Sequence, residues 1–382
     1  MREVATAEKI VVALSGGVDS SVAALLLKQA GADVAALHMT NWDDDDGYCS
    51  AAEDLNDARA VCQILDIPLH HANFTVEYRE QVFQQFLDDY AAGRTPNPDV
   101  LCNREIKFGV MLDHARRLGA TALATGHYAD RVRSESGVAL AIPRDRHKDQ
   151  TYFLHAVDQA ALAAARFPLA NLAKSEVRKL AARHGLPTRD KKDSTGICFI
   201  GERPFQAFLE TYLPAQPGHM QTLDGRTVGE HRGAAYYTIG QRKGLGIGGV
   251  AGASNAPWYV ADRDVASNVV YVVQGEDHPH LWSMGLDADA WHWVSGSAPA
   301  ALSTADGLRC EARIRHGQAP AACTARGQGD STVTVTFDEP QWAVAPGQYV
   351  VLYLDTICLG GGTIRERAGA LAATGRTSSV AG

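Results

Sequence analysis

The first half of the chain alternates short apolar runs with longer stretches in which apolar residues recur every three or four positions. Residues 10–14 and 33–39 are mostly apolar runs of strand length. Residues 21–30 and 51–65 show the helical spacing, and Gly31 marks the end of the first of these helices. Strands that alternate with helices in this way predict a doubly wound parallel sheet of the α/β class, covered by helices on both faces.

The same alternation continues as far as residue 125. We expect two further strands and two further helices there, with Pro68 and Gly119 as breaks between them. The expected strands cover 69–73 and 121–125, and the expected helices cover 76–90 and 106–118. Ligands in this architecture bind beyond the carboxyl ends of the strands, so the loops that follow residues 14, 39 and 125 should share one edge.

The pattern changes near residue 205, where a short helix at 205–212 precedes many short strands. An Asp224-Gly225 pair predicts a hairpin. Further strands are expected at 258–261, 269–273, 309–314, 332–337 and 349–354. We therefore expect an N-terminal α/β domain at 1–203, a small adaptor domain at 204–278, a C-terminal β-barrel at 279–368 and a disordered tail at 369–382.

Composition is typical of a globular protein with two or three domains. The chain has 382 residues, of which 46% are hydrophobic and 21% charged. No apolar run approaches the roughly 18 residues of a membrane-spanning helix, and the N-terminus lacks a signal-peptide pattern. Its seven cysteines form no C-x-x-C pair, which argues against a disulfide scaffold and against a structural zinc site. We expect a cytoplasmic protein with no membrane partner, in which any special cysteine is catalytic or redox-active.

The net charge of −8 hides an uneven distribution. Acidic residues are concentrated at 43–46, whereas basic residues cluster at 144–148, 189–192 and 242–243. Phosphate contacts supply most of the affinity for nucleic acids, and a local basic face can supply them on an acidic protein. The distribution therefore remains compatible with RNA binding.

The hexapeptide Ser15-Gly16-Gly17-Val18-Asp19-Ser20 lies between the first apolar run and the first helix. Glycines let a phosphate approach the main chain, the N–H groups at the helix start point at it, and Ser15, Ser20 and Ser21 add hydroxyl donors. The lysine and the spacing of the Gly-x4-Gly-Lys-Ser/Thr loop are absent. The hexapeptide instead resembles the pyrophosphate loop of the ATP-pyrophosphatase superfamily, whose members split ATP into AMP and pyrophosphate. The simpler alternative is a glycine turn with Asp19 as a helix cap.

A second chemical segment runs from Thr95 to Arg104 and contains two prolines, Pro96 and Pro98. We expect the prolines to keep the backbone out of a helix, so that Asp99 and Cys102 are presented on a shaped loop. Cys102 would then lie near the start of a helix at Glu105, where the helix dipole and Arg104 favour the thiolate. This predicts a nucleophile; the alternative is a small apolar residue that fills the core.

Cys198 lies in a short apolar run flanked by Gly196 and Gly201, behind the basic stretch 189–192. Taken alone it is equally compatible with a buried strand residue. It gains interest only beside Cys102.

Six segments together resemble the bacterial tRNA-specific 2-thiouridylases, in the expected order over nearly the whole chain. They are 15–20, Pro96-Asn97-Pro98-Asp99 with Leu101-Cys102-Asn103, Thr125-Gly126-His127-Tyr128, Lys148-Asp149-Gln150, 194–201 and 238–245. The resemblance implies an ATP-pyrophosphatase domain followed by two domains that bind tRNA. It also implies the acceptors for Lys, Glu and Gln as substrates.

The resemblance implies replacement of the C2 oxygen of the wobble uridine, U34, by sulfur. Oxide is a poor leaving group, so ATP adenylates the oxygen and AMP leaves. Cys198 would carry a persulfide received from a donor or relay protein. Cys102 would be the second thiol, which either attacks that persulfide to release sulfide or helps to deliver it, leaving a Cys102–Cys198 disulfide to be reduced. The two thiols must then approach each other, which requires loop closure over the bound tRNA. ATP is the co-substrate, magnesium accompanies it, and no tightly bound cofactor is expected.

The resemblance also implies individual binding roles. Asp99 matches a general acid/base or base-positioning residue, and Asn97 and Pro98 lie with it against the target base; the alternative for Asp99 is a turn-stabilising aspartate. The positions that match ATP contacts are Ala13, Leu14, Ser15, Gly16, Gly17, Val18, Asp19, Ser20, Met39 and Gly126. The positions that match tRNA contacts are His127, Lys148, Asp149, Gln150, Arg315, His316 and Gln348.

Two positions depart from the family pattern, and other functions stay open. His316 stands where a tyrosine is expected, which weakens an argument for stacking there, and Thr151 stands where serine is commoner. The acidic run 43–46 is better explained as a solvated loop than as a magnesium site, so we predict no protein metal site. The alternatives are another adenylating synthetase, of argininosuccinate, GMP or NAD, which needs neither cysteine, and an RNA-binding scaffold that keeps the loop only as structure.

Overall fold

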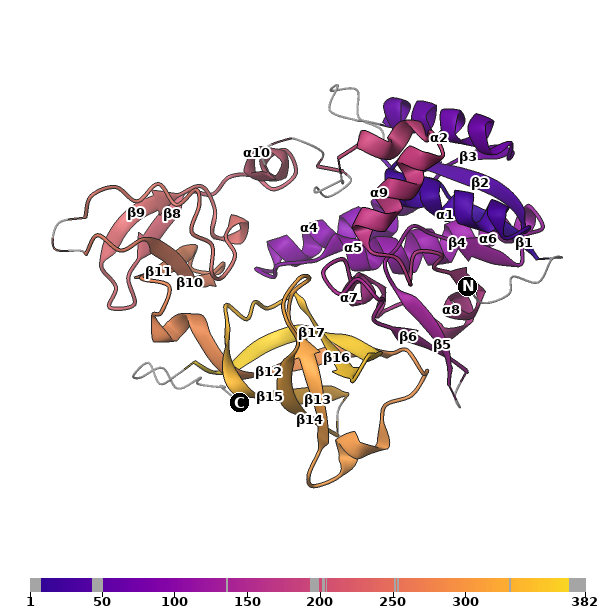
Figure 1. The fold of residues 1–382 in the computed structure, drawn as a ribbon. Coiled ribbons are helices and arrows are strands. Elements are labelled where there is room, and N and C mark those ends of the chain that lie inside the picture. The colour runs from indigo at the N-terminus through magenta and orange to yellow at the C-terminus, as the bar shows by residue number, and fades with distance from the viewer. Residues whose placement is uncertain are drawn as a thin grey trace.

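The computed structural model describes residues 8–42, 51–134, 137–192, 199–200, 203, 205–250, 252, 254–329 and 331–370. Figure 1 shows three parts: an α/β domain, a small sheet domain and a barrel. Within these ranges, every helix is too short or too polar to cross a bilayer.

The α/β domain is built on a five-stranded parallel sheet in the order β3-β2-β1-β4-β7. Its strands are β1 (Lys9–Ala13), β2 (Asp33–Thr40), β3 (Leu69–Asn73), β4 (Ala122–Ala124) and β7 (Ala165–Arg166). Side chains alternate between its faces: Ile10 and Val12 lie in one core cluster and Val11 in the other. A strand buried on both faces explains the continuous apolar run, and it confirms the predicted doubly wound sheet.

Helices cover both faces of this sheet. On one side lie α1 (Val18–Gln29), α2 (Ala51–Leu65) and α9 (Lys174–Arg183), whose buried residues share a cluster with Ile10 and Val12. On the other side α3 (Thr75–Tyr78), η1 (Arg79–Phe83) and α4 (Gln84–Ala91) follow one another without a break. The short elements α7 (Thr151–Leu154), α8 (Gln159–Ala164) and η3 (Pro187–Asp190) complete the domain.

The helix expected at 106–118 begins eight residues earlier. It comprises α5 (Pro98–Leu101), η2 (Cys102–Met111) and α6 (Leu112–Arg117), with Gly109 as a non-helical kink. Pro98 occupies the first turn, where a proline costs no hydrogen bond, and the Asn97 side chain caps the helix by accepting from the Asp99 N–H at 3.3 Å. The prediction that the prolines exclude a helix was therefore wrong.

The middle domain begins with α10 (Phe205–Glu210) and forms a sheet in the order β10-β11-β8-β9. Its strands are β8 (Gly218–Gln221), β9 (Thr227–His231), β10 (Trp258–Asp264) and β11 (Val269–Gln274), with η4 (Ala234–Tyr236) between β9 and β10. The Asp224-Gly225 hairpin is confirmed, with Gly225 at φ +88° between β8 and β9.

The last domain is a closed barrel of six strands in the order β12-β15-β14-β13-β16-β17, which the β12–β17 pairing closes. They are β12 (Trp282–Trp293), β13 (Leu308–Arg313), β14 (Ala321–Gln328), β15 (Thr332–Trp342), β16 (Tyr349–Leu354) and β17 (Ile357–Ala370), with η5 (Pro279–Leu281) and η6 (Ala300–Ser303). The predicted barrel is confirmed. Strand β17 passes the expected limit at 368, because Ala370 pairs with Ser283, and 371–382 lie outside the described residues.

One hairpin joins the first domain to the barrel. It consists of β5 (Asp130–Ser134) and β6 (Gly137–Ala141), and β6 pairs with β17 through Leu140 and Cys358. The barrel sheet thus extends into the α/β domain, which fixes the two relative to each other.

Candidate active site

The loop at 15–20 joins β1 to α1 at the carboxyl edge of the parallel sheet. Gly16 has φ +79°, and a Cβ on it would lie 2.4 Å from the main-chain oxygen of Asp54. A Cβ on Gly126 would lie 2.6 Å from the Ser20 nitrogen. Glycine at both positions therefore lets the loop pack directly on α2 and on the strand end after β4.

The loop is closed by its own hydroxyl groups. Ser20 Oγ accepts from the Ser15 N–H at 3.2 Å and donates to the Gly17 oxygen at 3.1 Å. Ser21 Oγ donates to the same oxygen at 2.7 Å and accepts from Thr188 Oγ1 at 3.0 Å. Ser21 is fully buried, so it supports the loop, and the prediction that its hydroxyl faces a phosphate was wrong. Ser15 is exposed and stays a predicted phosphate ligand.

A lysine far away in the sequence stands against this loop. Lys174 Nζ lies 2.7 Å from both carboxylate oxygens of Asp19 and 5.9 Å from the centre of the Tyr128 ring. The Tyr128 hydroxyl donates to the same carboxylate at 3.1 Å. Gly17, and not Asp19, occupies the cap position of α1, so Asp19 anchors a cation instead of capping the helix. Sequence reasoning missed Lys174, because a lysine at a helix start carries no local signal of its ion-pair partner.

The second chemical segment leads into α5, whose buried residue Leu101 packs in the cluster on the other face of the sheet from α1. Asp99 is half-buried on the first turn, and burial raises its pKa while Lys107 and His316 pull it back down. Lys107 Nζ lies 3.5 Å from His127 Nε2, and His127 follows Gly126. Lys107, which the sequence did not single out, thus connects the surroundings of Asp99 with the strand end that packs on the 15–20 loop.

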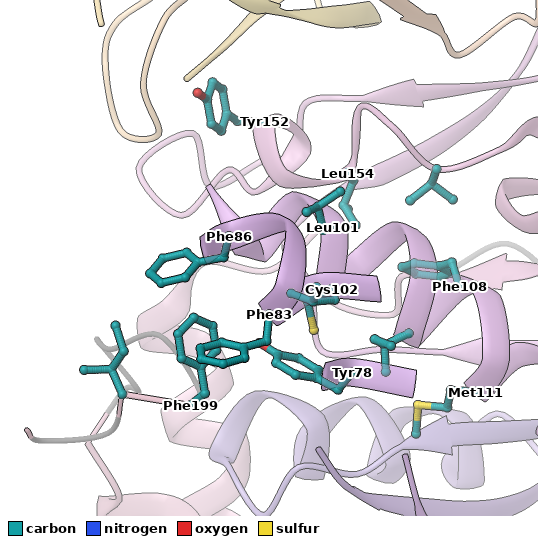
Figure 2. Packing of buried hydrophobic residues seen from close by; sticks show 14 of the residues in the cluster. Tyr78, Phe83, Phe86, Leu101, Cys102, Phe108, Met111, Tyr152, Leu154 and Phe199 are labelled. Carbon is teal, nitrogen blue, oxygen red and sulfur yellow. The ribbon is translucent and has the colours of Figure 1, made fainter. Parts of the chain in front are cut away.

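Cys102 is only 3% exposed and belongs to the aromatic core on this face of the sheet. Figure 2 shows it near Tyr78, Phe83 and Phe199. The expectation that Cys102 is presented on a loop was wrong, since it lies one turn inside a helix that starts at Pro98. Burial in this cluster is also what an apolar filler would show.

Cys198 lies outside the described residues, but the next residue is placed. Phe199 is fully buried, and its ring centre lies 5.1 Å from that of Phe83 and 4.9 Å from that of Phe86. The residue that follows Cys198 therefore packs in the same cluster as Cys102 (Figure 2).

Three predicted tRNA contacts face the protein. Asp149 is 3% exposed and forms a buried ion pair with Arg313 of the barrel, while the Thr151 N–H and hydroxyl donate to its other oxygen at 2.9 and 2.8 Å. Gln150 Oε1 accepts from the Tyr128 N–H at 2.9 Å. Gln348 Nε2 donates to the Thr95 oxygen at 2.8 Å. These side chains hold neighbouring segments of the protein, and the Asp149 carboxylate is fully engaged by Arg313 and Thr151.

Histidine chemistry differs at the two predicted positions. His127 is buried and burial, followed by the charge of Lys107, holds its pKa well below the usual range, so the ring is neutral at physiological pH. A neutral ring there cannot act as a cation toward phosphate. His316 is exposed and lies over Phe153, with ring centres 4.3 Å apart at 34°. His316 therefore lies against Phe153 with its ring tilted by 34°, and whether this position stacks on RNA stays a prediction.

A cavity of about 360 Å³ lies where the three domains meet, beside the segment that precedes Asn97. It is lined by Thr95, Thr238, Ile239, Gly240, Gln241, Arg315, Ala345 and Gln348. Two of these, Arg315 and Gln348, are predicted RNA contacts, and 238–241 belong to a segment that carried the family resemblance.

In the part of the chain that the structure describes, no group of three or more His, Cys, Asp or Glu side chains is arranged to hold a metal ion. The acidic run 43–46 lies outside the described residues.

Comparison with known proteins accounts for all three domains. Residues 8–202 match the tRNA methyl transferase HUP domain, 206–274 the tRNA methyl transferase PRC-barrel domain, and 283–364 the aminomethyltransferase beta-barrel domain. The chain is 54% identical over 381 residues to the tRNA-specific 2-thiouridylase MnmA of Burkholderia pseudomallei, covering 98% of this chain and 97% of that one. The chain belongs to the tRNA-specific 2-thiouridylase family.

A second member of the 2-thiouridylase family, from Chromohalobacter salexigens, is 54% identical over 363 residues and covers 94% of this chain and 93% of its own. Among solved structures, the U34-tRNA thiolase NcsA of Methanococcus maripaludis aligns with a TM-score of 0.34 at 18% identity, over 53% of this chain and 63% of that one.

Proposed function

We propose that this 2-thiouridylase family member replaces the C2 oxygen of the wobble uridine, U34, of tRNA by sulfur at the expense of ATP. One observation carries the proposal. The 15–20 loop packs on Gly126, the next residue His127 contacts Lys107, and Lys107 acts on Asp99, one helical turn before Cys102. The predicted phosphate-binding loop and the candidate nucleophile are thus linked by packing at Gly126, by the His127–Lys107 contact and by the charge of Lys107 acting on Asp99.

In the first step, the C2 oxygen of the uridine attacks the α-phosphorus of ATP, and pyrophosphate leaves. The main-chain N–H groups of the 15–20 loop and the ammonium of Lys174 hold the pyrophosphate end. Asp99, whose pKa is raised by burial, takes up or returns the uridine proton. Asn97 lies beside it and holds the base. Magnesium arrives with ATP, and no tightly bound cofactor takes part.

In the second step, the terminal sulfur of a Cys198 persulfide attacks C2 and AMP leaves with the original oxygen. Cys102 attacks the inner sulfur as its thiolate, so the sulfur–sulfur bond of the persulfide breaks and a Cys102–Cys198 disulfide forms. The two electrons that turn sulfane sulfur into the thione come from these thiols. A dithiol reductant then restores both cysteines, and a persulfide-carrying protein reloads Cys198. Because Cys102 is buried, tRNA docking must uncover it before this step.

The two C-terminal domains, at 204–278 and 279–368, bind the tRNA in this proposal. Arg315 and Lys148 approach phosphates, His316 on Phe153 offers a stacking face, and the cavity at the domain junction accepts part of the anticodon loop. The acceptors for Lys, Glu and Gln are the proposed substrates.

Nucleoside mass spectrometry tests the proposal. Substrate tRNA is incubated with the protein, ATP, magnesium, a persulfide donor and a dithiol, then digested. We expect one oxygen at U34 to be exchanged for sulfur, and no exchange without ATP or with Cys198→Ser. An ATP-dependent adenylating activity that thiolates no tRNA and is retained in the Cys102→Ser, Cys198→Ser double variant would favour an adenylating synthetase of another kind, and thiolation that persists in this variant would contradict the persulfide step. No pyrophosphate release with substrate tRNA would favour the RNA-binding scaffold.

A further inference from the structure

The segment that leads into α5, residues 93–96, is held by the two other domains. Its main-chain groups have few bonds within the segment itself. The Thr95 N–H donates to the Pro346 oxygen at 2.8 Å, and Gln348 Nε2 donates to the oxygens of Thr95 at 2.8 Å and Pro96 at 3.3 Å. A Cβ on Gly347 would lie 2.6 Å from the Thr95 nitrogen, so the barrel loop packs directly on this segment.

The middle domain holds the same segment mainly through Arg263 on β10, beside a Thr238 Oγ1–Thr95 Oγ1 hydrogen bond of 3.3 Å. Arg263 Nε and Nη2 donate to the Gly93 oxygen at 3.1 and 2.8 Å, and Nη2 also donates to Thr95 Oγ1 at 2.9 Å. A Cβ on Gly93, which has φ +69°, would lie 2.7 Å from Val265 Cγ2, so β10 and the segment are in close contact. The planar guanidinium thus binds two acceptors that are two residues apart in the segment, which the single ammonium of a lysine cannot do in the same geometry.

We propose that Arg263 is a positioning residue for the reaction: it sets the entry of α5 and thereby the placement of Asn97, Asp99 and Cys102. The inference rests on the proposed function for what those residues do. Pro98 and the Asn97 cap make the helix start well defined once Thr95 and Pro96 are fixed. The N–H groups of Gly93 and Arg94 and the Arg94 side chain bond residues 89 and 90 of α4, so the start of the segment is tied to its own domain, and Thr95 takes a restraint from outside the segment. Arg263 supplies that restraint from the middle domain, which binds tRNA in the proposal. A shift of the middle domain when tRNA binds would therefore change the position of the reacting groups.

The chain offers a matched control in Arg367 of β17. Its Nη1 donates to the His280 oxygen at 2.8 Å, and its Nη2 donates to the Ala261 oxygen at 3.0 Å and lies 3.2 Å from Asp262 Oδ2. Arg367 therefore joins the barrel to the middle domain with the same chemistry, but it makes no contact with 93–97 among the described hydrogen bonds.

The test compares Arg263→Met, Arg263→Lys and Arg367→Met in the full chain. Because small misplacements of reacting groups are costly, we expect Arg263→Met to lower kcat for thiolation by roughly 30- to 100-fold, with the Kd for tRNA changed less than about threefold. Arg263→Lys should recover part of kcat, and Arg367→Met should stay within about threefold of the parent in kcat. A weaker tRNA affinity in Arg263→Met with an unchanged kcat would overturn the proposal. So would equal reductions in kcat in Arg263→Met and Arg367→Met.

Hydrogen exchange separates this inference from the proposed function, because it needs no turnover. Arg263→Met should speed amide exchange in peptides that cover 93–102, and Arg367→Met should not. If Arg263→Met does not fold, Thr95→Val removes one of the two acceptors, and a smaller increase in the same peptides is expected. Unchanged exchange in Arg263→Met and Thr95→Val would contradict the positioning role. If Arg263→Met exchanges faster but the parent thiolates no tRNA, the restraint by Arg263 is supported and the proposed function is contradicted.

Discussion

The loop at 15–20 and the segment at 93–102 carry the two halves of the proposed chemistry, and they are held in opposite ways. The hydroxyls of Ser20 and Ser21 close the first on its own Gly17 oxygen, within one strand–helix unit. The second has its main chain bonded to Arg263, Pro346 and Gln348 of the other domains. In the proposed function, ATP binding is therefore built into one domain, whereas sulfur delivery requires all three domains to be assembled.

Replacing Cys102 should give the largest effect, because it should abolish sulfur transfer and leave the ATP-dependent step intact. Cys102→Ser is expected to reduce thiolation to background, since the persulfide loses its second thiol, while tRNA binding and ATP-dependent pyrophosphate release remain. A hydroxyl in this aromatic cluster should also lower the free energy of unfolding by about 1–3 kcal/mol. Nucleoside mass spectrometry and a denaturant titration measure the two effects.

Cys62 provides the control for that substitution. It is equally buried, in the cluster on the opposite face of the sheet. Cys62→Ser should lower stability by a similar amount and leave thiolation intact. Equal loss of thiolation in both variants would assign Cys102 a structural role.

Gly16→Ala tests the 15–20 loop, which is closed by its own hydroxyl groups. Its Cβ would meet the Asp54 main chain at 2.4 Å, and the backbone must shift because no flexible side chain can give way. Displacement of the phosphate ligands should lower ATP-dependent pyrophosphate release by roughly a hundredfold. Gly31→Ala is the control: it has φ +82° but nothing within 4 Å of the new Cβ, so it should cost about 1 kcal/mol of stability and no activity. Equal activity of the two variants would contradict the loop's role.

These two regions also show what a sequence can predict. The 15–20 loop was predictable because strand, glycines and helix are adjacent in the chain. The start of α5 was missed because two prolines were taken as breakers, although a proline in the first turn favours a helix that Asn97 caps. The pairing of β6 with β17 and the contacts of Lys174 and Arg263 were missed because their partners lie more than 150 residues away in the chain. The burial of Asp149 against Arg313 has the same origin. The β5–β6 hairpin pairs locally and was not singled out by the sequence.

Lys174→Met should raise the KM for ATP by roughly tenfold, because a charge-assisted contact near the phosphates is lost and Asp19 is left without its ammonium. Steady-state pyrophosphate release at several ATP concentrations measures the effect. Lys28→Met, at the far end of α1, is the matched control, since its ammonium bonds only the Asp66 oxygen among the described contacts. A KM for ATP that stays at the parent value in Lys174→Met would remove Lys174 from the site.

Asp99→Asn should have the smallest effect on the fold, with a defined sign. Burial raises the Asp99 pKa above its ordinary value, so its neutral form favours the fold; that contribution is present at low pH and is lost as the pH rises through the raised pKa. Asparagine does not ionise, so the variant's Tm should gain on the parent's as the pH rises. Thiolation by the parent should fall with acidification above the range of an exposed carboxyl group. A Tm of the variant that falls relative to the parent's as the pH rises would show that Asp99 is stabilised as the anion.

The central claim, that ATP activates the C2 oxygen of U34, can be followed atom by atom. A substrate tRNA that carries oxygen-18 at C2 of U34 is thiolated by the full chain in the presence of ATP and a persulfide donor, and the AMP is analysed by mass spectrometry. The account predicts AMP that contains oxygen-18 in the same amount as the 2-thiouridine formed. AMP that carries only solvent oxygen, alongside thiolated tRNA, would contradict it.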